Sequence, residues 1–402
     1  MKNIFASLTL LLSFSAFSQT AVLTDPWLLK EMGVAALNED LSAKVAYAVL
    51  NPLQEMRLHQ LAHARGRCGG YEVLSQKETF NQNRIAGIFS KIKSFQKRDL
   101  LLQKDIKLAG PGISENLAER REIREALKLV QKERIKDFVS WFSSFPNRNN
   151  KSRDSNLPMQ ALAKRLQDSV LVSHPNWTQD FIEHDSTGQK SLRVIIPGRS
   201  RPNEIVVLGG HADSISFRGN APGADDNASG SADIVEVLNV ISETGFTPER
   251  SIHLFFYAGE ESGLLGSAEI AESYKNEGKN VVAVMQLDMT SFPGSGLFKF
   301  SNMTDFTTPT LRKLIEDLNT LYVGGEVIHS ECGYGCSDHA SWYRNGFPTV
   351  IPFESHMDEY NPNIHTPQDT ITAEINFEHS AMFAKLALSY VMEVSASQWR
   401  AF

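Results

Sequence analysis

The stretch SIHLFFYAGEESGLLGS at residues 251–267 contains a bulky apolar run, a glycine and two adjacent glutamates, Glu260 and Glu261. The apolar run is typical of a buried strand, and the residues after the second glycine favour a helix. Adjacent side chains on a strand point to opposite faces, so we expect the two acids to have different roles. The stretch predicts a strand that ends in a polar turn and leads into a helix.

Apolar segments of strand length alternate with segments of helical period from about residue 176 onward. The expected strands are 191–198, 203–214, 251–259, 280–289 and 348–354, with a shorter one near 297–301. The expected helices are 227–243, 264–278, 308–321, 337–346 and 376–395. This alternation predicts a mainly parallel mixed sheet covered by helices on both faces, which is a three-layer α/β/α fold.

The N-terminal part of the chain has a different pattern. Residues 1–18 contain a lysine, an apolar run and a small-x-small site, which predicts an export signal cut before Gln19. The apolar run, about 13 residues, is shorter than the roughly 20 residues needed to span a bilayer. Residues 19–115 have helical periodicity and few strand candidates, so we expect a helical propeptide or accessory segment there.

The main domain is expected over residues 116–402. One long charged helix over 118–145 and another over 157–171 are predicted to lead into the sheet. A net charge of −7 gives no indication of nucleic-acid binding, and 42% hydrophobic with 22% charged residues is ordinary for a globular protein. We expect an exported monomer, secreted or periplasmic, that does not bind membranes.

The chain has three cysteines. Cys332 and Cys336 lie in CGYGC, and this spacing in an exported protein favours a short disulfide loop. A pair of metal-binding thiolates is the alternative, but no third or fourth sulfur ligand accompanies them. Cys68 is left over, and removal of the segment that carries it would make the number even.

Acidic and imidazole side chains collect at the ends of three expected strands and in two loops. They are His211 and Asp213 after VVLGG, Glu260 and Glu261 after HLFFYAG, Asp288 in VVAVMQLDM, Asp225 and Asp226 in APGADDNASG, and His365 in NPNIHTPQDT. Each has an ordinary explanation when taken singly, such as a helix N-cap for an aspartate. Together they are expected at the carboxyl edge of the sheet, where such folds bind ligands. Imidazoles mixed with carboxylates suit zinc or a similar divalent ion.

The motifs GGHADS, APGADDNASG, AGEESGLLGS, QLDM, CGYGCSDHASW, PFES and NIHTPQDT occur in this order over roughly residues 130–400. Together they closely resemble the exported bacterial leucyl aminopeptidases of the M28 metallopeptidase family, the Vibrio aminopeptidase type. The resemblance implies two zinc ions bridged by Asp226. His211 and Asp288 would complete one site, and Glu261 and His365 the other.

The resemblance also implies roles for residues that bind no metal. Glu260 is implied as the general acid and base, Asp213 as the acid that orients His211, and Tyr334 as a donor to the oxyanion. The Asp226–Asn227 peptide bond is implied to be cis. Asn227 stands where the Vibrio type has an acid, and we expect little consequence because that position is not a ligand.

By the same resemblance, the disulfide and six apolar residues line a pocket for the first side chain of the substrate. The six are Met289, Ile351, Phe353, Met357, Tyr360 and Ile364. Ordinary core packing is the alternative for these residues, above all for Ile351 and Met357. The implied activity is removal of leucine, or another large apolar residue, from peptides with a free N-terminus.

Two other functions stay open on the sequence alone. One is a different zinc enzyme on the same scaffold, such as a glutaminyl cyclase-like transferase, and the other is a binding domain without catalysis. Some polar residues also keep two interpretations. Asp338 is either a helix cap or a support of the site, and Asp369 supports either His365 or only a turn. His59 and His63 are expected at the surface, and His253 in packing.

Overall fold

The computed structural model describes residues 19–41, 45–64, 70–74, 89–90, 117–216, 218–396 and 399. The predicted export signal and Cys68 lie outside these residues. No helix within the described ranges has the length and apolar character needed to cross a membrane.

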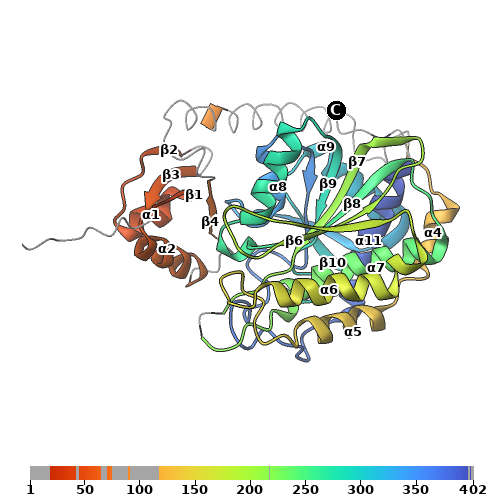
Figure 1. Ribbon diagram of the computed structural model, residues 1–402, viewed down its shortest axis with the longest axis horizontal. Coiled ribbons are helices and arrows are strands. Elements are labelled where there is room, and N and C mark those ends of the chain that lie inside the picture. The colour runs from red at the N-terminus through yellow and green to blue at the C-terminus, as the bar shows by residue number, and fades with distance from the viewer. Residues whose placement is uncertain are drawn as a thin grey trace, which may run out of the picture.

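A six-stranded mixed sheet forms the centre of the main domain (Figure 1), with the strand order β12-β9-β7-β8-β6-β5. Its strands are β5 (Thr178–Ile182), β6 (Ser191–Ile196), β7 (Arg201–His211), β8 (Arg250–Tyr257), β9 (Asn280–Gln286) and β12 (Thr349–Val350). The first four strands in this order are parallel, β6 pairs antiparallel with β8, and β5 pairs antiparallel with β6. The predicted mainly parallel mixed sheet is confirmed, although β5 was not predicted.

Helices cover both faces of this sheet. They are α4 (Arg121–Leu127), α5 (Lys132–Phe142), α6 (Asn156–Ser169), α7 (Gly230–Thr244), α8 (Leu265–Asn276), α9 (Pro309–Leu318), α10 (His339–Arg344) and α11 (Phe377–Ala396). Strand β7 illustrates the alternation of faces. Val206 and Leu208 belong to the core shared with α7 and α11. Val207 belongs to the second core, with Tyr274 of α8 and Trp342 of α10. The three-layer prediction is therefore confirmed.

A second sheet of three strands, in the order β11-β10-β13, lies beside the first. Its strands are β10 (Lys299–Met303), β11 (Glu326–Ser330) and β13 (Pro352–Phe353), and short helical turns occur at Leu171–Ser173 and Asn319–Val323. The strand predicted at 348–354 is thus divided between the two sheets. This division carries the chain from the central sheet to the candidate pocket described below.

The long helix predicted over 118–145 is two helices, α4 and α5, which are separated near Gln131. The physical reason is a contact far away in the sequence. The buried carboxylate of Glu236 on α7 accepts the amide of Gln131 at 2.7 Å, immediately before α5 begins. Sequence periodicity does not reveal such a tertiary cap.

The prediction of a helical N-terminal segment needs correction. Two helices are present, α1 (Pro26–Met32) and α2 (Pro52–Ala64), but they accompany an antiparallel sheet in the order β2-β3-β1-β4. Its strands are β1 (Thr20–Thr24), β2 (Asn38–Asp40), β3 (Val45–Leu50) and β4 (Tyr71–Val73). Strand β3 reads VAYAVL, and its alanines and leucine favour helices. Pairing with β1 prevails because it buries Val22 on one face and Leu23 on the other.

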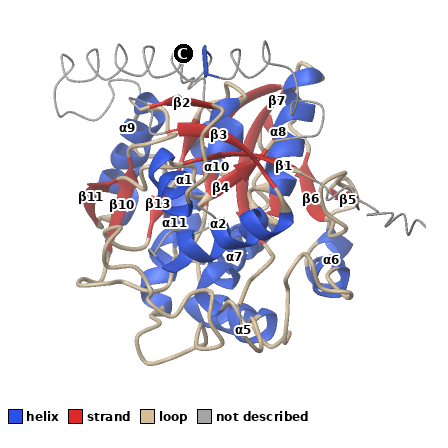
Figure 2. Cartoon of the chain, turned by 90° about the vertical axis from the view of Figure 1, so that its left-hand side faces the viewer, coloured by secondary structure: helices blue, strands red, loops and turns tan. Residues whose placement is uncertain are grey.

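This N-terminal unit, β1–β4 with α1 and α2, packs against the main domain (Figures 1 and 2). Strand β4 makes the closest connection. The amide of Val73 donates to the carbonyl of Gly263 at 3.1 Å, and Glu72 forms an ion pair with Arg344 of α10. Gly263 has a φ of 104°, and a Cβ there would lie 2.9 Å from a side-chain carbon of Val73. Only glycine is tolerated at this contact.

Candidate metal centre

Three parallel strands deliver polar side chains to one edge of the central sheet. His211 is the last residue of β7, Glu260 and Glu261 form a tight turn directly after β8, and Asp288 comes two residues after β9. These placements were predicted from the sequence. His365 comes from the loop before α11 and has a φ of 58°. Left-handed backbone is costly for a side chain with a Cβ and tends to occur at functional sites.

The side chains form two groups that share Asp226. In the first, His211 Nε2 lies 3.0 Å from Asp226 Oδ1 and 3.3 Å from Asp288 Oδ1. In the second, His365 Nε2 lies 2.8 Å from Asp226 Oδ2 and 3.0 Å from Glu261 Oε2. Each group has one imidazole and two carboxylates, so the five predicted ligands come together in the predicted pairing.

The donor set fits divalent cations. All five side chains are buried. Apart from the imidazoles of the two groups, no described residue donates a hydrogen bond to the buried oxygens of Glu261 or to Oδ1 of Asp288. A buried carboxylate without a partner costs several kcal/mol. Nitrogen and oxygen donors of this kind suit zinc and related ions.

The pKa shifts indicate the same shortage of positive charge. Burial raises the pKa of Glu260 well above its ordinary range. Burial, followed by the charge of Asp226, raises the pKa of Glu261 to about 7. Burial opposes protonation of His365, but the Glu261 charge and the hydrogen bond to Asp226 outweigh it and raise the pKa of His365 to about 10. Cations at this centre would stabilise the ionised acids and the neutral imidazoles.

Glu260 belongs to neither group, although it is adjacent to Glu261. Its nearest charged contact is His211 Nε2, which lies 4.0 Å from Oε2. Both oxygens of Glu260 are buried without a hydrogen-bond donor in the described part of the chain. The two glutamates are therefore placed differently, as the first sequence pattern predicted. Glu260 is left as a carboxylate able to exchange protons beside the centre.

Asp213 contacts His211 and also supports the glutamates. His211 Nδ1 lies 3.2 Å from the carbonyl oxygen of Asp213 and 3.5 Å from its Oδ1. The Asp213 carboxylate accepts the amides of Glu260 at 3.0 Å and Glu261 at 3.3 Å. Asp213 thus connects the end of β7 to the turn after β8.

The Asp226–Asn227 peptide bond is cis, as the resemblance implied. The side chain of Asn227 has more contacts than the sequence suggested. Its Nδ2 donates to the carbonyl of Leu287 at 3.0 Å, and its Oδ1 accepts the amide of Met289 at 3.2 Å. It therefore joins the loop of Asp226 to the residues on both sides of Asp288, and an aspartate could not donate the first of these bonds.

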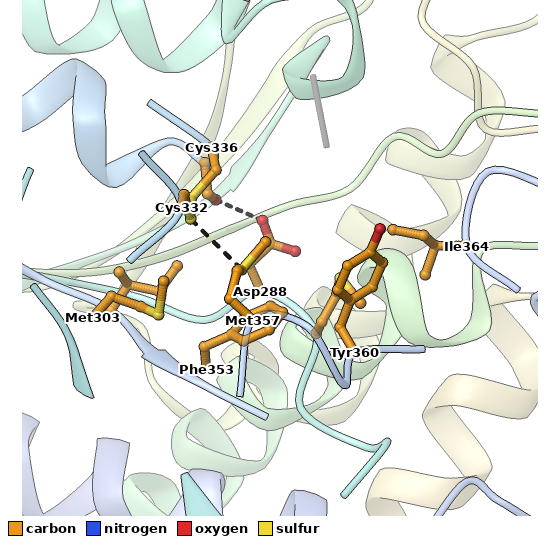
Figure 3. Close-up of a pocket in the computed structure, with 11 residues that line it drawn as sticks. Asp288, Met303, Cys332, Cys336, Phe353, Met357, Tyr360 and Ile364 are labelled. Carbon is orange, nitrogen blue, oxygen red and sulfur yellow. Dashed lines mark hydrogen bonds between the residues drawn. A yellow bond between two sulfur atoms is a disulfide. The ribbon is translucent and has the colours of Figure 1, made fainter. Parts of the chain in front are cut away.

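An apolar pocket opens beside the first ligand group (Figure 3). The six residues predicted for the substrate pocket all line it, together with both cysteines, which form the predicted disulfide. Asp288 reaches the same pocket, and Ser337 donates to its Oδ2 at 2.5 Å. The pocket also contains Met303 of β10, which sequence reasoning missed because no local motif marks it. An apolar cavity thus adjoins the acids.

Tyr334 lies in the disulfide loop and is only 4% exposed. It lines a second, small cavity that includes Tyr71 and Glu72 of β4, as well as Arg344. Tyr71 and Glu72, which line this cavity together with Tyr334, belong to the N-terminal unit. His59 of this unit was expected at the surface, but it is buried against Tyr71.

Arg148 is a second residue that the sequence did not reveal. Its guanidinium is fully buried and donates to the carbonyls of Ala212 at 2.9 Å and Gly223 at 2.8 Å. It also lies over the ring of Phe142, 4.5 Å from the centroid. Burial lowers the pKa of Arg148 to about 10. This cation fixes the end of β7 to the loop that carries Asp226.

The chain is similar to proteins of one family. Residues 192–391 match the profile of peptidase family M28. A probable leucine aminopeptidase of Trichophyton verrucosum is 34% identical over 322 residues, which cover 78% of this chain and 83% of the relative. Leucine aminopeptidase 1 of Arthroderma gypseum is 36% identical over 294 residues, which cover 68% of this chain and 76% of the relative.

A solved structure has the same fold. The crystal structure of LapB from Legionella pneumophila has a TM-score of 0.79 and 24% identity to this chain. The match covers 94% of this chain and 100% of LapB. The likeness is therefore not restricted to the main domain and takes in much of the N-terminal unit.

Proposed function

The chain belongs to peptidase family M28, and we propose that it is a dinuclear zinc aminopeptidase that removes leucine or another large apolar residue from the N-terminus of peptides. One observation carries this proposal. Asp226 belongs to both ligand groups, so the two groups can hold a pair of ions that share one carboxylate. An apolar pocket lies directly beside them.

Divalent ions at such a centre supply Lewis acidity, which lowers the pKa of water and polarises a carbonyl oxygen. The protein supplies the rest. Glu260 takes a proton from the attacking water and delivers a proton to the leaving amine. Its burial supports this role, because burial raises the pKa of Glu260 and makes the carboxylate a better proton acceptor. Tyr334 donates a hydrogen bond to the oxyanion that forms from the scissile carbonyl.

Specificity is assigned to the apolar pocket. Met289, Met303 and Phe353 line it with the disulfide, and Asp288 is its only charged residue among those described. A leucine side chain gains by leaving water for such a surface. A glutamate side chain would lose its hydration there without a partner.

We also propose export and processing. Residues 1–18 act as an export signal, and residues 19–115 as a pro-segment that covers the centre until it is removed. The position of β4 supports the second proposal, because Glu72 reaches Arg344 and Val73 reaches Gly263, which follows the Glu260–Glu261 turn.

Hydrolysis of leucine and glutamate anilides, before and after chelation, tests the proposed function on one preparation with measured metal content. We expect two zinc ions per chain, cleavage of the leucine substrate only, and loss of activity on chelation. An amino-blocked leucine anilide should not be cleaved. Cleavage of the blocked substrate would overturn the aminopeptidase assignment. Cyclisation of an N-terminal glutamine with one ion bound would favour a glutaminyl cyclase-like enzyme instead.

A further inference from the structure

The two acidic segments of the centre are held by the same kind of contact. Asp213 lies two residues after His211, and its carboxylate accepts the consecutive amides of Glu260 and Glu261. The second segment, around Asp226, has an equivalent support that the proposed mechanism does not use. In both cases the supporting aspartate lies a few residues after a histidine of the centre.

This second support is Asp369, which lies four residues after His365 and is 1% exposed. Its carboxylate accepts the amide of Asp225 at 2.9 Å on one oxygen and the amide of Asp226 at 3.1 Å on the other. Its carbonyl accepts the amide of Ala224 at 3.0 Å. One residue therefore holds three consecutive amides of the loop that carries the shared ligand.

Packing alone does not explain a carboxylate at this position. Asp369 is buried next to two other acids, Asp225 and Asp226, so its charge is costly there. The two amides reach different oxygens of the carboxylate, and an asparagine in this position would direct an NH₂ group at one of the two N–H donors. The two hydrogen bonds therefore favour an ionised carboxylate at this position, although burial disfavours its negative charge.

The bond also connects parts of the centre that are far apart in the sequence. Asp226 lies in the loop before α7, whereas His365 and Asp369 lie in the loop before α11. Only 2.8 Å separates His365 Nε2 from Asp226 Oδ2. Holding the amide of Asp226 from the loop that carries His365 fixes the distance between these two ligands.

We propose that Asp369 is a positioning residue of the metal centre, which sets the Asp226 carboxylate between the two ligand groups by holding the amides of Asp225 and Asp226. It corresponds to Asp213, which holds the amides of Glu260 and Glu261. This inference rests on the proposed function, because it assigns Asp226 to both metal sites.

The test compares the full chain with Asp369→Asn and with a matched control, Asp233→Asn. Asp233 of α7 is equally buried and accepts a hydrogen bond from Ser380 at 2.9 Å, but it belongs to neither ligand group. Metal affinity is measured by competition with a chromogenic chelator, and geometry by the visible spectrum of the cobalt-loaded protein. Supports of metal ligands typically affect affinity by about 10–100-fold. We expect that loss, with an altered spectrum, for Asp369→Asn, and less than threefold change for Asp233→Asn.

Three outcomes would overturn the inference. They are wild-type affinity with an unchanged spectrum in Asp369→Asn, an equal loss in Asp233→Asn, or a fall in melting temperature that is the same in chelator as in zinc. If Asp369→Asn does not fold, metal affinity and the cobalt spectrum are measured on Asp369→Glu. This variant keeps both carboxylate oxygens but shifts their position. An unchanged cobalt spectrum in that variant overturns the inference as well. Failure of the wild-type chain to bind any metal would instead reject the proposed function.

Discussion

The ion pair between Glu72 of β4 and Arg344 of α10 gives a direct test of whether the N-terminal unit covers the centre. The two side chains are only 9% and 11% exposed. Removing one member of a buried pair leaves the other charge uncompensated, which costs about 3–5 kcal/mol. The substitution Glu72→Ala would place this cost on the docked arrangement, because undocking returns Arg344 to water.

This free-energy cost greatly increases the fraction of chains in which the N-terminal unit is undocked. At about 1.4 kcal/mol for each tenfold change, a loss of 3 kcal/mol raises the ratio of undocked to docked chains by about 100-fold. We therefore expect the uncleaved Glu72→Ala protein to hydrolyse leucine p-nitroanilide at least tenfold faster than the uncleaved wild type. The initial rate is measured on the full chain, with intact mass showing that the N-terminal unit is still attached.

Two further variants make the test specific. Glu39→Ala removes an exposed acid from β2, at the opposite edge of the same small sheet, and should leave the rate unchanged. Reversal of both charges, Glu72→Arg with Arg344→Glu, should restore a low rate because it rebuilds the pair. The reasoning is refuted if Glu72→Ala stays within twofold of the wild type, or if the reversed pair is as active as the single variant.

Three more outcomes follow from the site and its surroundings. Glu260→Gln should lower kcat by about 10²–10⁴-fold with the metal content of the wild type, because it removes proton transfer but no ligand; steady-state kinetics with metal analysis checks this. Phe353→Ala should enlarge the apolar pocket and shift kcat/KM from leucine towards phenylalanine anilide by about tenfold, and unchanged selectivity would exclude Phe353 from the pocket. Burial lowers the pKa of His379 to about 4, although its bond to the Glu354 carbonyl opposes the shift. In the unfolded chain this histidine binds a proton near pH 6.5, whereas in the folded chain it stays neutral down to about pH 4. The free energy of unfolding is therefore highest above pH 6.5, and it decreases by about 1.4 kcal/mol per pH unit as the pH is lowered from about 6 to 4. Urea unfolding at several pH values should therefore have a shallower acid slope for His379→Gln.

The sequence predicted those parts of the protein that depend on local rules. Apolar runs located the strands, and the rule that ligands bind at the carboxyl edge of the sheet predicted that His211, Glu261 and Asp288 come together. The pocket followed from motif resemblance, which did not identify Met303 or Ser337 as lining residues. Arg148 was missed because its hydrogen-bond partners are backbone carbonyls, which any residue type can supply, so no sequence motif indicates them.

The errors in the N-terminal region have a similar cause. The strands β1 and β3 mix strand-forming residues with alanine and leucine, which favour helices, so pairing between the two segments decides their state. The break between α4 and α5 depends on Glu236, about a hundred positions away along the chain. Local propensity is a weak predictor wherever a distant partner supplies the deciding bond.

The turn of Gly259–Gly263 connects the candidate metal centre to the N-terminal unit. Its amides at Glu260 and Glu261 are held from within the centre by Asp213, and its last carbonyl accepts the amide of Val73 from β4. The same short turn therefore places a metal ligand and receives the N-terminal unit. If ions bound by Glu261 order this turn, they also order the acceptor for β4. Linkage then requires the docked unit to strengthen metal binding by the same factor by which metal strengthens docking. Such a pro-segment would favour loading of the centre while it covers it.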